Sequence, residues 1–105
     1  MKENRKFSRY KAILHFAVKN QKTSFNCISY DISKCGVSFL TPEDLILKEK
    51  VSISYPPIKF IREGFITSEA VIPNYPKMKK YGVEFEKHMS HEEVIDFLKA
   101  SETTN

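Results

Sequence analysis

The chain has 105 residues, of which 41% are apolar and 29% charged. This is the size and composition of a single globular domain with its own core. Cys27 and Cys35 are too few for a disulfide scaffold and fit no common zinc spacing, so packed, reduced thiols are expected. We expect neither a membrane helix, which needs roughly 18 apolar residues, nor a signal peptide, and therefore a cytoplasmic protein.

The net charge is concentrated at the N-terminus. Residues 1–11 carry five basic and one acidic side chain, a balance of +4, and the other 94 residues carry 12 of each sign. Phe7 is the one large apolar side chain within residues 1–9, which is too little to order such a segment. We expect a flexible basic arm over residues 1–10 that can meet an anion, followed by a neutral folded body.

Three strands are predicted in the first half of that body. Every second residue from 12 to 18 is apolar, which predicts a half-buried strand over residues 11–19. A second strand over 23–30 ends at the turn DISKCG, residues 31–36, and a short third strand over 37–40 stops before Pro42. The inward residues of the first strand are Ala12, Leu14, Phe16 and Val18.

Three more strands are predicted in the second half. Residues 51–55 alternate again, and 60–72 form a long stretch in which Gly64 predicts a bulge or bend. A turn bracketed by prolines is expected at 74–77, before a last strand over 81–85. The segment LILKEK between the third and fourth strands is ambiguous.

A helix closes the chain. Ser90 and Glu93 have the spacing of a capping box, and the residues that follow present one apolar face. Six short strands and one helix predict a mainly β fold, a small antiparallel barrel or sandwich with a terminal helix over residues 11–100. Residues 101–105 are expected to be a disordered tail.

Two elements carry the chemistry. Arg5 and Arg9 each offer a planar fork of donors that can hold a phosphate or grip the O6 and N7 acceptors of guanine. On an extended chain their Cα atoms lie about 13 Å apart, enough to embrace one ligand from two sides.

The turn at residues 31–36 supplies the complementary groups. Asp31 and Ser33 point to one side of an extended strand. The carboxylate can accept from guanine N1 and N2, and the hydroxyl can serve phosphate or ribose. Gly36 allows a positive φ or a close backbone approach.

The order R-x-x-x-R at Arg5–Arg9, then D-x-S-x-x-G at Asp31–Gly36 about 20 residues later, resembles the signature of PilZ domains, bacterial receptors for cyclic di-GMP. A strand directly after the second arginine, YGVEF near the end and a closing helix also resemble that family. One departure is Glu49-Lys50, where many members have a glycine turn.

The resemblance implies a six-stranded antiparallel β-barrel crossed by the arm, with cyclic di-GMP as ligand, no further cofactor and no metal. Lys6 and Tyr10 are secondary candidates, for local potential and for stacking. A separate protein effector of unknown identity would receive the signal, and an affinity on the order of micromolar is expected. The implied ligand contacts are Arg5, Arg9, Asp31, Ser33 and Gly36.

Two rival functions stay open. A small barrel that binds single-stranded nucleic acid would use the arm on phosphates, although its body should then also be basic. A PilZ-like adaptor could act through protein contacts without nucleotide. Catalysis is not expected, since no nucleophile and base stand at a recognisable spacing, and His88 and His91 lack a third ligand for a metal.

Overall fold

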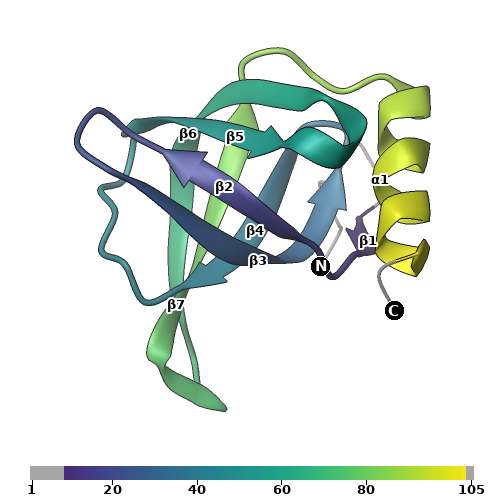
Figure 1. The fold of residues 1–105 in the computed structure, drawn as a ribbon. Coiled ribbons are helices and arrows are strands. Elements are labelled where there is room, and N and C mark those ends of the chain that lie inside the picture. Colours follow the sequence, from purple (N-terminus) through teal and green to yellow (C-terminus); the bar gives the residue numbers. More distant parts are fainter. Residues whose placement is uncertain (1–8, 104–105) are drawn as a thin grey trace, which may run out of the picture.

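The computed structural model describes residues 9–103, which form one antiparallel barrel closed by a helix (Figure 1). The ring of strands runs β3-β2-β5-β6-β7-β4 and returns to β3, which confirms the predicted six-stranded barrel with a C-terminal helix. The elements are β1 (Tyr10–Lys11), β2 (His15–Lys19), β3 (Ser24–Ser33), β4 (Gly36–Thr41), β5 (Lys50–Tyr55), the 3-10 turn η1 (Pro56–Ile58), β6 (Phe60–Ile72), β7 (Tyr75–Phe85) and α1 (His91–Thr103).

The strand predicted over residues 11–19 is two strands, β1 and β2, which pair with successive parts of β3. Its inward residues are buried as predicted, but the ladder is interrupted at residues 12–14. The buried hydroxyl of Ser29 fills the gap: it accepts from the Leu14 N–H at 2.8 Å and donates to the Ala12 carbonyl. A side chain therefore replaces strand partners where the chain bends.

The strand predicted over residues 23–30 runs on to Ser33, so the turn predicted over 31–36 was placed too early. Asp31 pairs with Ser38, and Ser33 pairs with Gly36, which leaves Lys34 and Cys35 as the turn. The pairing with β4 shifts register between Ser29 and Asp31. Asp31 therefore lies within the sheet, which holds its side chain more firmly than a loop would.

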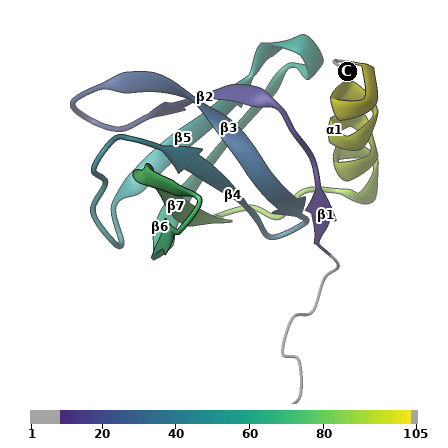
Figure 2. The ribbon, with the colours of Figure 1, turned by 90° about the horizontal axis from the view of Figure 1, so that it is seen from below.

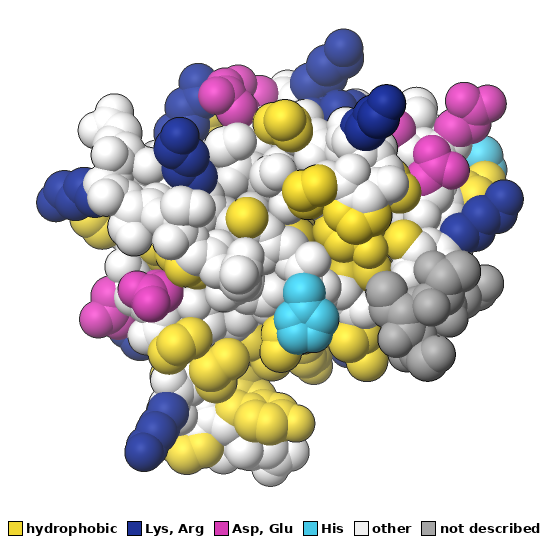
Figure 3. Space-filling model, viewed as in Figure 1, with side chains coloured by type: hydrophobic (Ala, Val, Ile, Leu, Met, Phe, Trp, Pro, Cys, Tyr) yellow, Lys and Arg dark blue, Asp and Glu magenta, His cyan; other side chains and the backbone are white. Residues whose placement is uncertain are grey.

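The strands β6 and β7 form a long hairpin that leaves the barrel (Figures 1 and 2). The predicted bulge at Gly64 was wrong: this residue pairs regularly with Val51 and Phe85, and the irregularities fall after Ile66 and after Val71. The turn predicted at 74–77 was also misplaced, because β7 already begins at Tyr75. Figure 3 shows apolar side chains on this projecting hairpin.

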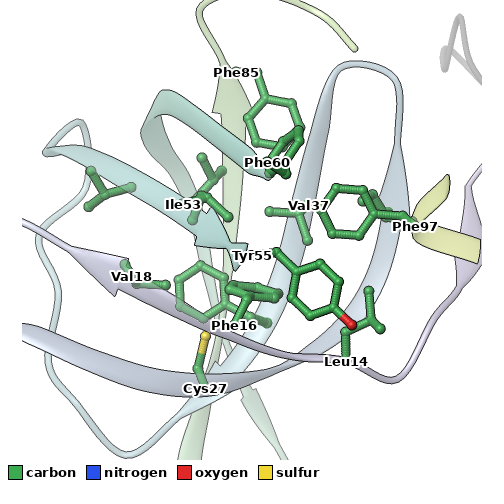
Figure 4. Close-up of a cluster of buried hydrophobic side chains, with 14 of the residues drawn as sticks. Leu14, Phe16, Val18, Cys27, Val37, Ile53, Tyr55, Phe60, Phe85 and Phe97 are labelled. Atoms are coloured by element: carbon green, nitrogen blue, oxygen red, sulfur yellow. The ribbon is translucent and has the colours of Figure 1, made fainter. Parts of the chain in front are cut away.

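The helix α1 covers one end of the barrel (Figure 1), and its Phe97 lies within the cluster of buried side chains (Figure 4). Its Phe97 stacks on Tyr55, with ring centroids 5.4 Å apart, and meets Phe60 edge-on at 4.6 Å. Its predicted capping box is confirmed, since Ser90 and Glu93 exchange hydrogen bonds. The helix runs to Thr103, beyond the expected end of the folded part at residue 100. Within residues 9–103, no helix is long and apolar enough to cross a membrane.

A partly buried ion pair between Arg62 and Glu93 anchors the start of α1 to the barrel. Arg62 on β6 donates to Glu93 at 2.6 Å and to the carbonyls of Lys87 and His88. Burial raises the pKa of the Glu93 carboxyl, but hydrogen bonds from Ser90 and Arg62 and the charge of Arg62 outweigh this and hold the pKa below its ordinary value of 4.5. The helix start is thus tied electrostatically to the barrel wall.

Candidate functional site

A row of small and polar residues crosses the outer face of four strands. Register places Asp31 opposite Ser38, Ser38 opposite Gly82, and Gly82 opposite Ser68. Their chain neighbours Ile32, Val37 and Val83 face the core, so alternation turns this row outward. A pocket of about 330 Å³ lies on it. Its walls also include Arg9, Cys35, Gly36, Thr67, Lys80 and Glu84.

The first motif and the second meet at this pocket. The Arg9 guanidinium donates to Asp31 Oδ1 at 2.9 Å, and the Ser38 hydroxyl donates to the same oxygen at 2.6 Å. The Asp31 side chain is 13% exposed, and that of Arg9 is 37% exposed. Asp31 is therefore fixed from within the sheet, whereas Arg9 can move away toward solvent.

Ser33 and Gly36 lie near the pocket in different ways. The Ser33 side chain is 1% exposed, and its hydroxyl contacts Cys35 Sγ at 3.2 Å, so the structure does not bring it to the pocket wall. Gly36 does line the pocket, but without a positive φ. A Cβ at Gly36 would lie 2.1 Å from the Val83 carbonyl oxygen. Glycine is needed there for the close approach of β4 to β7.

The remaining candidates lie on the arm. Arg5 and Lys6 fall outside the described residues. Tyr10 belongs to β1, pairs with Ile32 and is 41% exposed, but it does not line the pocket. Their contribution to ligand binding stays a prediction.

Several pocket residues were missed by the sequence analysis. Ser38 is a polar residue between the buried apolar residues Val37 and Phe39 of β4, which is a local signal that could have marked it. Gly82 stands in YGVEF, where a strand glycine signals a close approach. Thr67, Ser68 and Lys80 carry no such signal, because they reach the pocket through the register of β6 and β7.

A larger hollow, about 480 Å³, lies near the turn between β2 and β3. Its Lys50 is already paired, since this lysine contacts Glu63 at 3.3 Å and Glu86 at 3.2 Å. The 330 Å³ pocket, with the exposed cation of Arg9 on a carboxylate held by Ser38, is the better candidate for an anionic, hydrogen-bonding ligand. Among residues 9–103, no three His, Cys, Asp or Glu side chains are grouped to hold a metal ion.

Three solved structures share this fold. The inhibitor of motility MotI/DgrA of Bacillus subtilis is 15% identical with a TM-score of 0.69, over 97% of this chain and 51% of that chain. The complex of K. pneumonia MrkH with c-di-GMP is 12% identical with a TM-score of 0.67, over 93% and 50%. The PilZ domain of Escherichia coli YcgR with c-di-GMP is 15% identical with a TM-score of 0.65, over 97% and 94%. This chain thus spans about half the length of the first two.

No curated protein sequence matches this chain. The family model described as "PilZ domain" matches residues 3–100, nearly the whole chain. The match includes both motifs and all the strands of the barrel. This protein belongs to the PilZ domain family.

Proposed function

We propose that this protein is a receptor for cyclic di-GMP that binds the nucleotide at the Arg9–Asp31 pocket without chemically altering it. The observation that carries the proposal is the meeting of the two motifs, 22 residues apart, in one ion pair at a pocket. Two similar folds, those of MrkH and the YcgR PilZ domain, were solved with c-di-GMP. Together these support a nucleotide site in the same family.

The ion pair indicates how the ligand enters. The Arg9 fork would exchange the Asp31 carboxylate for a phosphate or for guanine O6 and N7. The Asp31 carboxylate, held by Ser38, would then accept from guanine N1 and N2. Each group gives up a charged partner and gains a new hydrogen-bonding partner on the ligand, so the net gain is moderate and an affinity on the order of micromolar follows.

The arm would complete the site. A volume of about 330 Å³ is at the low end of the roughly 300–1,000 Å³ of small-molecule sites. The part of the arm that precedes β1, with Arg5 and Lys6, would close over the nucleotide and supply a further wall. The closed arm and the outer barrel face would form a new surface that a separate protein effector recognises.

Titration calorimetry with cyclic di-GMP tests the proposal. The wild-type protein should release heat, and Arg9→Ala and Asp31→Ala should each weaken binding by at least tenfold, the loss of about one charge-assisted hydrogen bond. The matched controls are Lys22→Ala and Asp96→Ala, which remove exposed charges outside the pocket. The nucleotide should be recovered intact by chromatography after incubation.

Absence of heat from the wild-type protein would refute the receptor function. Equal affinity of Arg9→Ala, Asp31→Ala and their controls would refute the site instead. Hydrolysed nucleotide would show an enzyme where we propose a receptor.

A further inference from the structure

Two lysines share one aromatic ring beside the pocket. The Nζ of Lys11 lies 3.8 Å from the centroid of the Tyr30 ring, and the Nζ of Lys80 lies 4.2 Å from it. The two ammonium groups are therefore at most 8.0 Å apart, the sum of these distances. Cation–π attraction to the ring holds both of them in place.

These lysines differ from others on the barrel. Lys50 is paired with Glu63 and Glu86, and Lys79, the chain neighbour of Lys80, is paired with Asp44 and Glu69. Within the described part of the chain, neither Lys11 nor Lys80 has a carboxylate oxygen within 4.0 Å. Two like charges thus stand together, with an uncharged ring as their shared partner.

This cluster adjoins the pocket through the backbone and through one side chain. Lys80 lines the pocket together with Arg9. Lys11 is the backbone partner of Asp31 on β1, and Tyr30 immediately precedes Asp31 at the register shift of β3. The cluster therefore reaches the pocket with the Lys80 side chain, and its other two members, Lys11 and Tyr30, are backbone neighbours of Asp31, the carboxylate that we assign to the ligand.

We propose that Lys11, Tyr30 and Lys80 form an anion subsite that takes a phosphate group of the bound nucleotide. The inference rests on the proposed function, which it deepens by assigning phosphate binding to residues outside the two motifs. A phosphate group that contacts the two ammonium groups supplies the negative charge that the described carboxylates do not. Tyr30 acts as a positioning residue that holds both lysines at its ring.

The first experiment measures cyclic di-GMP affinity at several salt concentrations. Lys11→Gln and Lys80→Gln should each weaken binding about two- to fivefold, the worth of an exposed ion pair. The double variant should lose affinity further and depend less on salt, because fewer charges remain to be screened. Lys22→Gln, at the exposed turn after β2, removes the same charge elsewhere and should leave both quantities unchanged.

Two substitutions at Tyr30 distinguish a role of its ring in positioning the lysines from a role in the stability of the barrel. Tyr30→Phe keeps a ring for both cations and should retain the affinity and salt dependence of the wild type. Tyr30→Leu removes the ring and should approach the double lysine variant. Thermal unfolding of each variant establishes that the barrel is intact.

The second experiment titrates pyrophosphate while NMR follows the Tyr30 ring and the lysine Cε signals. Shifts in the wild-type protein that vanish in the double lysine variant support the subsite even if cyclic di-GMP does not bind. Unchanged affinity and salt dependence in the double variant would overturn the inference while leaving the receptor function standing. If wild type binds neither cyclic di-GMP nor pyrophosphate, both proposals fail.

Discussion

Replacing Gly36 by alanine tests whether this motif glycine serves the fold or the ligand. The added Cβ would lie 2.1 Å from the Val83 carbonyl oxygen, 3.1 Å from the Val83 carbonyl carbon and 3.4 Å from Glu84 Cα. All three are backbone atoms of β7, so no side chain can rotate away. Relief requires β4 and β7 to separate.

The required separation sets the magnitude. Contacts below 3.0 Å are essentially never seen for a Cβ, so the strands must part by at least 3.0 minus 2.1, or 0.9 Å. An N···O distance of about 2.9 Å would then grow to about 3.8 Å, beyond hydrogen-bonding range. Losing one or two such bonds, with overpacking, costs about 2–3 kcal/mol and lowers Tm by roughly 10–20 °C.

Urea unfolding of Gly36→Ala and Gly82→Ala provides the measurement and its control. At Gly82 the nearest atom to an added Cβ is the Ser68 hydroxyl oxygen at 2.5 Å, which can rotate away, and the next are 3.7 and 3.8 Å away. Gly82→Ala should therefore change the free energy of unfolding by less than about 1 kcal/mol. It should nevertheless weaken nucleotide binding, because the methyl group occupies the pocket floor. A wild-type midpoint for Gly36→Ala would refute the reasoning.

Three further predictions concern the two cysteines, Glu93 and Ser29. Burial raises the pKa of the Cys27 thiol, so iodoacetamide should modify Cys35 in the native protein and Cys27 only on unfolding, and cyclic di-GMP should protect Cys35, a pocket residue. Equal rates for both thiols would contradict this. The pKa of Glu93 is lower in the folded than in the unfolded protein, so on acidification the unfolded chain binds a proton before the folded one does. The contribution of Glu93 to the free energy of unfolding is therefore present above about pH 5 and should be lost as the pH falls through the folded-state pKa. Glu93→Gln should lessen that fall, as unfolding free energies between about pH 6 and pH 3 would show. Ser29→Ala removes the hydrogen-bond acceptor of the buried Leu14 N–H and should lower the free energy of unfolding by about 1–3 kcal/mol in a denaturant titration. A smaller loss would show that the Leu14 N–H finds another acceptor.

Much of the fold followed from local periodicity. The alternation over residues 11–19 marked Ala12, Leu14, Phe16 and Val18 as inward, and all four are buried. The capping box likewise marked the start of α1. These features depend on neighbours within a few positions of the chain, which is where sequence patterns act most directly.

The errors fell where pairing between distant strands competes with local signals. The pattern DISKCG has turn composition, yet its first three residues pair with β4 and belong to a strand. Gly64 suggested a bulge, yet an added Cβ there would lie 2.4 Å from the Glu84 carbonyl oxygen, so it is a point of close packing. In both cases the partner strand decided what the residue does.

The sequence by itself determined a mainly β fold, the terminal helix and the combination of an arginine arm with an acidic motif, because each depends on the spacing of residue types over a short stretch of the chain. Only the tertiary structure decided that Arg9 meets Asp31, that Ser33 turns away from the pocket, and that Lys11 and Lys80 converge on Tyr30. Those contacts join residues up to 50 positions apart (Tyr30 and Lys80), and their register is set by closure of the barrel and by the bulge after Ser29.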